Sequence, residues 1–254
     1  MHAHEVVAVG LDGQRETIVE VPNQPSGLGW LPDGTMLVVS MVDRKLLRMG
    51  AKGLTEVADL SSLAPFHCND MVVDAQGRAY IGNFGFDIYS GGAAEPRTTT
   101  LVMVTPDGEA RAVAEDMAFP NGSVITPDGR TLIVAETMAR RLTAFDIRPD
   151  GSLENRRVWA QLEVPPDGIC LDADNCIWVA VPTRPGGFVR VAEGGKVLDR
   201  IDLEDRGGYA CMLGGPDRRT LLLLEAFDGN PANIARGNGR LRTVEVETGG
   251  AGLP

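Results

Sequence analysis

Three polar residues, Asn69, Asn121 and Asp167, stand at the same position of three similar segments in this chain of 254 residues. Their side chains offer amide and carboxylate oxygens, which are the ligands that hard divalent cations prefer in proteins. Ca²⁺ is the ion we expect first, while Zn²⁺, Mn²⁺ or Mg²⁺ are alternatives. Because only one of the three side chains is charged, water or substrate would have to complete the coordination shell.

A turn is the alternative role for these residues, because Asn and Asp before Gly often form turns. In the stretch FPNGSVITPDGRTLIVAET, however, the later PDG already supplies a hairpin turn between two apolar runs. Asn121 is therefore not needed for that turn, and its phase in the repeat matches that of Asn69 and Asp167. This agreement favours a binding role.

An internal repeat must position these residues. Five segments each contain an apolar run, a tight turn and a second apolar run. They begin at Ser26, Asn69, Asn121, Asp167 and Ala210, and their turn residues follow eight places later at Gly34, Gly77, Gly129, Asn175 and Arg218. The starts are roughly 40 to 50 residues apart, which is the spacing of β-propeller blades. Equivalent positions of a propeller ring one mouth of its channel.

The repeat predicts an all-β protein with a single domain over residues 1–254. A later amphipathic strand completes each repeat, and one more strand of this type, at residues 6–13, has no hairpin before it. Two blade counts fit this pattern. One is a six-bladed β-propeller whose first blade is incomplete at the N-terminus, and the other is a five-bladed ring closed by an N-terminal strand.

His67 is the only histidine away from the N-terminus. It is a candidate to bind substrate through a hydrogen bond, and the alternative is a packed loop histidine. The segment at residues 84–100 lengthens one repeat interval. We expect either a loop over the mouth of the site, with Phe84, Phe86 and Tyr89 shaping a pocket, or a disordered insertion.

Two acidic residues, Glu136 and Glu225, follow inner-strand runs and are candidates to face the channel or solvent. The cysteines lie in apolar surroundings without a CxxC pair, which favours buried, reduced thiols over disulfides or a zinc site. They are Cys68, Cys170, Cys176 and Cys211.

The net charge of −11 argues against a nucleic-acid partner, because phosphate binding needs clustered Lys and Arg. No apolar run approaches the roughly 20 residues needed to cross a bilayer, and MHAHEVVAVG is not a signal peptide. We therefore expect a soluble, cytoplasmic protein without a membrane partner.

Several stretches in order along the chain carry a resemblance to a known family. They include HCNDMVVDAQGRAYIGNFGFD, FPNGSVITPDGRTLIVAET, PPDGICLDADNCIWVA and ACMLGGPDRRTLLL. These stretches resemble the senescence-marker-protein, gluconolactonase and luciferin-regenerating-enzyme family, also called regucalcin-like proteins. Members of this family are six-bladed propellers with a divalent metal in the channel, and many hydrolyse sugar lactones. The resemblance therefore favours six blades over five.

The resemblance implies that Asn121 and Asp167 are metal ligands and that Asp167 also accepts a proton. It makes Asn69 a contact for substrate or water. The family's first blade also opens on a Glu-Ser/Gly-Pro-x-Trp strand whose Glu is a ligand, and the stretch from Ser26 to Trp30 lies one blade too late to replace it. We expect from this that Met1 is an internal start, which mass spectrometry of the native N-terminus would test.

The predicted function is a metal-dependent hydrolase that opens a sugar or related lactone, with one divalent cation as cofactor. The alternative is a non-catalytic propeller that binds a metal or a small molecule and has lost activity for want of the N-terminal Glu ligand. Neither the lactone, the metal nor the oligomeric state is fixed by these residues.

Overall fold

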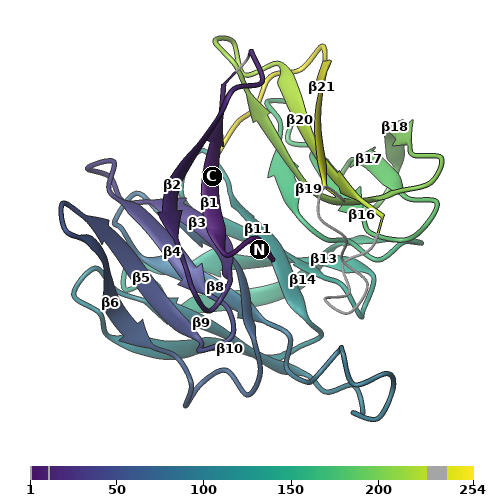
Figure 1. The fold of residues 1–254 in the computed structure, drawn as a ribbon. Helices are drawn as coiled ribbons and strands as arrows, with labels where there is room; N and C mark the ends of the chain where they lie inside the picture. Colours follow the sequence, from purple (N-terminus) through teal and green to yellow (C-terminus); the bar gives the residue numbers. More distant parts are fainter. Residues whose placement is uncertain (1, 11, 228–238) are drawn as a thin grey trace. The chain divides into compact units, whose positions relative to one another are not determined.

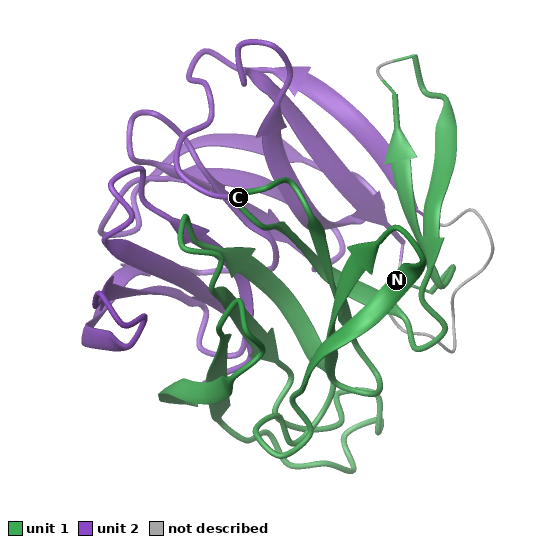
Figure 2. Cartoon of the chain, turned by 90° about the vertical axis from the view of Figure 1, so that its left-hand side faces the viewer, with its two compact units in different colours: residues 1–116 green, residues 117–254 purple. Residues whose placement is uncertain are grey.

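The computed structural model describes residues 2–10, 12–227 and 239–254. All regular secondary structure in these residues is β-strand, and none of them forms a helix long and apolar enough to cross a membrane. The chain groups into two compact units, residues 1–116 and 117–254, shown in separate colours in Figure 2. Each unit is built from antiparallel sheets whose strands follow one another in chain order (Figure 1).

The first unit contains a two-stranded sheet and two four-stranded sheets. The two-stranded sheet is β1 (Glu5–Val9) and β2 (Arg15–Glu20). The next sheet is β3 (Pro25–Trp30), β4 (Met36–Ser40), β5 (Lys45–Gly50) and β6 (Gly53–Asp59). The third is β7 (Cys68–Val73), β8 (Ala79–Asn83), β9 (Thr99–Val104) and β10 (Ala110–Met117).

The second unit contains two four-stranded sheets and one in which three strands are described. The first is β11 (Pro120–Ile125), β12 (Thr131–Glu136), β13 (Arg141–Ile147) and β14 (Leu153–Gln161). The second is β15 (Ile169–Leu171), β16 (Ile177–Val181), β17 (Gly187–Val191) and β18 (Val197–Asp202). The third is β19 (Gly207–Gly214), β20 (Thr220–Ala226) and β21 (Arg240–Glu245).

The predicted repeat is confirmed by the backbone. All five predicted turn residues have positive φ and lie between the first two strands of a sheet: Gly34, Gly77, Gly129, Asn175 and Arg218, with φ of 82°, 80°, 70°, 59° and 56°. Positive φ suits the tight turns that join adjacent antiparallel strands. The all-β propeller architecture predicted from the repeat is therefore correct.

The predicted count of six blades is wrong. Five sheets of three or four strands form blades in the described residues, and the N-terminal segment forms only the hairpin β1–β2. In the described residues, no further strand pairs with this hairpin. The prediction of a single domain over residues 1–254 stays a prediction.

Apolar side chains fill the spaces between neighbouring sheets within each unit. In the first unit, Val39 and Ile81 belong to one core cluster that joins the sheets β3–β6 and β7–β10. In the second unit, Val124 and Val179 join the sheets β11–β14 and β15–β18, and Trp178 belongs to a further cluster that reaches β19–β21. The four cysteines are buried and free, as the sequence predicted.

Glycines at the second position of three repeats let the first strands of neighbouring sheets approach one another closely. A Cβ atom on Gly122 would lie 2.6 Å from Ile169 N and 2.7 Å from the carbonyl oxygen of Asp167. Gly27 is similarly close to the backbone of Asn69, and Gly168 to that of Tyr209 and Ala210. The three glycines are not among the residues with positive φ, so the space beside them is what requires glycine.

The buried carboxylates Glu136 and Glu225 fasten strands together. Glu136 is fully buried and accepts hydrogen bonds from Arg141 Nε at 2.8 Å and from Ala118 N at 2.8 Å. Burial alone would raise the pKa of Glu136, but these hydrogen bonds, with that from Thr143, hold it below its ordinary value. Glu225 is paired with two arginines of β21, so both residues have structural partners.

The close approach at Gly122 predicts that Gly122→Ala is destabilising, although alanine normally improves a strand position that holds glycine. The new methyl group would meet backbone atoms of the neighbouring sheet, which cannot move as a side-chain tip can. We expect the free energy of unfolding in urea to fall by about 1–3 kcal/mol.

Gly50→Ala is the matched control, because a Cβ there would have its nearest neighbour at 3.6 Å, an ordinary contact. Equal stability of the Gly122→Ala variant and the parent protein would contradict the packing described for these strands.

Candidate metal and substrate site

Asn121 lies in strand β11, so the interpretation of this residue as part of a turn is wrong. Its side chain is 3% exposed, and its Nδ2 donates a hydrogen bond to Thr137 Oγ1 at 3.0 Å. Thr137 Oγ1 donates in turn to the carbonyl oxygen of Pro166 at 2.8 Å. Because the amide nitrogen is occupied by Thr137, the amide oxygen is turned away from that hydroxyl and is the atom suited to a cation.

Asp167 stands two residues before strand β15, and its side chain is partly buried. Its backbone is fixed, because Asp167 N donates to the carbonyl oxygen of Ala180 at 2.9 Å and Gly168 N donates to that of Tyr209 at 3.0 Å. Asp167 also directly follows Pro166, which accepts the hydrogen bond from Thr137. The residues at the start of β15, here called its head, are thus held against β11 and β19.

The second unit therefore brings the backbones of Asn121 and Asp167 to neighbouring strand heads. Their donor atoms are oxygens, which fits a hard divalent cation. Within residues 2–10, 12–227 and 239–254, no group of three or more His, Cys, Asp or Glu side chains is placed to hold a metal ion. A cation held by Asn121 and Asp167 would need further oxygen ligands, from amides, water or substrate.

Asn69 belongs to the first unit, in strand β7, with 5% of its surface exposed. Its carbonyl oxygen accepts a hydrogen bond from Ser26 Oγ at 3.1 Å. Ser26, in β3, thus links that strand to β7. The predicted contact between Asn69 and substrate or water stays a prediction.

Asp70, the next residue of β7, was missed by the analysis of the sequence. No described residue donates a hydrogen bond to its carboxylate or forms an ion pair with it, and its side chain is only partly exposed. Burial raises its pKa to about 6. The one sign in the sequence that Asp70 is unusual is its position in the repeat, where three other repeats have glycine.

The pH dependence of stability tests this environment. When the pKa of an Asp rises on folding, stability falls as pH increases from about 4 through about 6, since the unfolded chain ionises the group more easily. Asp70→Asn removes the group that ionises, so the variant does not lose this stability as the pH rises. The gain in free energy of unfolding should therefore be about 1 kcal/mol larger at pH 8 than at pH 5.

Asp33→Asn is the control for this measurement, because Asp33 lies in an exposed turn where hydrogen bonds from Thr35 lower its pKa. A difference between Asp70→Asn and the parent protein that did not change with pH would show that Asp70 titrates normally.

His67 lies just before β7, in the first unit. Its ring stacks on that of Phe66, with centroids 4.0 Å apart, and its Nδ1 is buried without a hydrogen-bond partner in the described part of the chain. Burial lowers the pKa of His67, with the nearby Arg44 acting in the same direction and Asp87 against it. The substrate contact predicted for His67 stays a prediction, but its ring is neutral near pH 7.

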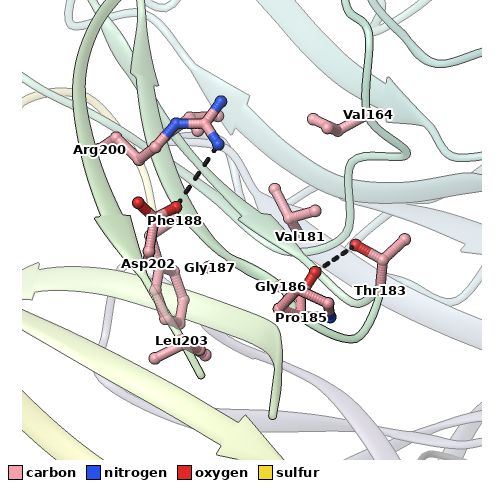
Figure 3. Close-up of a pocket in the computed structure, with 11 residues that line it drawn as sticks. Val164, Val181, Thr183, Pro185, Gly186, Gly187, Phe188, Arg200, Asp202 and Leu203 are labelled. Carbon is pink, nitrogen blue, oxygen red and sulfur yellow. Dashed lines mark hydrogen bonds and ion pairs between the residues drawn. The ribbon is translucent and has the colours of Figure 1, made fainter. Parts of the chain in front are cut away.

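A hollow in the second unit lies over strands β16, β17 and β18 (Figure 3). Arg200 and Asp202 pair at 3.4 Å on one side of it, and Thr183 Oγ1 donates to the carbonyl oxygen of Pro185 at 3.2 Å on the other. Neither Asn121 nor Asp167 belongs to its lining. The hollow is therefore separate from the predicted ligands.

Comparisons with known proteins identify the family of this chain. Residues 1–226 match the model of a family described as the SMP-30/Gluconolactonase/LRE-like region. The chain therefore belongs to this family, which is the one that the sequence resembled.

Individual proteins are similar to the chain at low identity. Regucalcin of Danio rerio is 27% identical over 71% of this chain and 61% of its own length. Diisopropyl-fluorophosphatase of Loligo vulgaris is 29% identical over 70% of this chain and 63% of its own length. The matches thus span less than two thirds of these relatives.

Solved structures support the fold. A calcium-binding protein, regucalcin, from Agrobacterium tumefaciens matches 99% of this chain and 85% of its own chain, with a TM-score of 0.79 and 23% sequence identity. At that identity the likeness concerns the architecture alone.

Proposed function

We propose that this protein is a hydrolase that opens a lactone and uses one divalent cation. Membership of a family that includes gluconolactonase supports a hydrolytic activity of this class. The similarity to an enzyme named diisopropyl-fluorophosphatase also supports a hydrolytic activity. The observation that supports the proposal is the close approach of Gly122 to the backbone of Asp167, because it brings the backbones of Asn121 and Asp167 to the starts of neighbouring strands.

Asn121 and Asp167 are the residues that would hold the cation. When bound, a divalent cation supplies Lewis-acid polarisation of the ester carbonyl. Thr137 keeps the Asn121 side chain in one orientation through the hydrogen bond to Nδ2. The backbone hydrogen bonds of Asp167 and Gly168 fix the point from which the Asp167 carboxylate extends.

Asp167 is the proton acceptor in this proposal. Water adds to the carbonyl carbon of the lactone, and the Asp167 carboxylate takes one of its protons. The bond between the carbonyl carbon and the ring oxygen then breaks, and the proton passes to the departing alkoxide. The product is the open hydroxy acid. We propose Asn69 and His67 as contacts for the substrate.

A non-catalytic binding protein is the second candidate function. Asp167 is the only carboxylate among the three predicted oxygen donors, and one negative charge makes a weak cation site on its own. A propeller with such a site would bind a small molecule or metal without turnover.

Replacing Asp167 tests the proposal. We expect Asp167→Ala to lower the Ca²⁺-stimulated hydrolysis of δ-gluconolactone and dihydrocoumarin by about 100-fold, because the proton acceptor and a ligand are both removed. Calcium affinity, measured by titration calorimetry, should fall in the same variant. Mn²⁺ and a chelator should be compared with Ca²⁺ in the parent protein.

Glu163→Gln is the matched control, since Glu163 is an exposed carboxylate in the same segment. The lactonase assignment is wrong if Asp167→Ala keeps the full metal-stimulated rate. Calcium binding by the parent protein without hydrolysis of any lactone would favour the binding protein.

A further inference from the structure

The head of strand β11 carries a β-bulge, which places Asn121. The register of β11 against β12 shifts between Pro120 and Ser123. The two residues in between, Asn121 and Gly122, therefore oppose the single residue Ala135 of β12. A bulge takes its extra residue out of the regular alternation of the strand and often re-aims a side chain beside a binding site. The pair of a polar residue and a glycine thus marks a bulge here.

A second bulge places Asp167 at the head of β15. Asp167 N donates to the carbonyl oxygen of Ala180 at 2.9 Å, and Ala180 N donates to that of Gly168 at 2.9 Å. Two residues, Asp167 and Gly168, thus oppose one residue of β16. The two bulges adjoin, because a Cβ on Gly122 would lie 2.7 Å from the carbonyl oxygen of Asp167. Each predicted ligand of the second unit is therefore the first residue of a bulge.

The second bulge also fixes the carbonyl group of Pro166. This carbonyl and the N–H of Asp167 belong to one peptide unit, which is planar. The N–H is held by the carbonyl oxygen of Ala180 in β16. The carbonyl oxygen of Pro166 accepts the hydrogen bond from Thr137 Oγ1 at 2.8 Å. The strand pairing at Asp167 therefore sets the position of the acceptor that Thr137 meets.

The hydroxyl group of Thr137 passes this constraint to Asn121. A carbonyl oxygen can only accept a hydrogen bond, so the single hydroxyl proton of Thr137 is given to Pro166. Towards Asn121 the hydroxyl oxygen can then only accept, and within an amide only the NH₂ group can donate. Nδ2 of Asn121 accordingly lies 3.0 Å from Thr137 Oγ1. The carbonyl of Pro166 thus decides which end of the Asn121 amide faces Thr137.

We propose that Thr137 is a positioning residue through which the bulge at Asp167 orients the amide of Asn121. Its hydroxyl keeps the NH₂ end of the amide turned to itself and the oxygen turned to the cation. Valine at this position would neither donate nor accept, so the amide could also present its NH₂ group, which a cation repels. Asn121 is only 3% exposed, so little water is available to replace the lost hydrogen bond. The inference rests on the proposed function, because it concerns the cation site used there.

The calcium affinity of Thr137 variants, measured by titration calorimetry, tests this role. We expect Thr137→Val to weaken the binding of Ca²⁺ about tenfold and Thr137→Ser, which keeps the hydroxyl, to stay within about twofold of the parent protein. Thr126→Val is the matched control, because Thr126 follows the opposite end of β11 and its hydroxyl donates to Asp128 in a turn. Circular dichroism and thermal unfolding show whether each variant is folded.

A second background separates the orientation of the amide from general packing. In Asn121→Asp both terminal atoms of the side chain are oxygens, so a turn of the side chain no longer presents a nitrogen to the cation. In that background, Thr137→Val should weaken the binding of Ca²⁺ about twofold or less. A tenfold loss in both backgrounds would make Thr137 a packing residue and overturn the proposal.

The NH₂ group of Asn121 reports its orientation without any cation. Selective ¹⁵N labelling of asparagine side chains gives NH₂ signals, and the signal that disappears in Asn121→Asp belongs to Asn121. Its protons should exchange with solvent more slowly in the parent protein and in Thr137→Ser than in Thr137→Val. If the exchange rates and calcium affinities follow this order while no lactone is hydrolysed, the positioning role stands and the proposed reaction fails. Metal-stimulated hydrolysis by a parent protein that equals Thr137→Val in both exchange and calcium affinity would keep the proposed function and overturn this inference.

Discussion

The structure depends on a close approach of backbones between the first strands of neighbouring sheets. Gly27, Gly122 and Gly168 each lie against the start of the first strand of the following sheet in their own unit. A Cβ atom on any of them would come too close to the backbone of that strand. The apolar clusters between the sheets supply the attraction, and glycine removes the atom that would oppose it. In the repeated pair of a polar residue and a glycine, the glycine therefore has a packing role.

The same contact brings chemistry to the strand heads. Gly122 lies close to the backbone of Asp167 and Gly168. Asn121, the residue before Gly122, therefore lies near the start of the next sheet. The hydrogen bonds from Asn121 to Thr137 and from Thr137 to Pro166 also join the two strands.

Glu136, at the end of β12, is paired with Arg141 and Arg156, so it is not a candidate for a reactive carboxylate. In the first unit, Asp70 has no such partner among the described residues, and burial keeps its pKa raised.

Much of this fold follows from local patterns, because turn chemistry is local. Arg218 has no special turn propensity, yet its place in the repeat predicted a turn, and its φ of 56° confirms it. The outermost strands were missed, since strands such as β18 are mostly exposed and lack an apolar pattern. The count of six blades came from the family resemblance, and the hairpin β1–β2 forms a two-stranded sheet instead of a sixth blade of three or four strands. The contact between the rings of His67 and Tyr89 joins residues some twenty positions apart, which no local pattern encodes.

We propose that the packing at Gly122 makes Asn121 and Asp167 two ligands of one divalent cation. Anomalous scattering from crystals of the protein grown with saturating Mn²⁺ measures this directly. We expect an anomalous peak within coordinating distance of Asn121 Oδ1 and of the Asp167 carboxylate. Well-ordered density for both side chains with no such peak between them would contradict it.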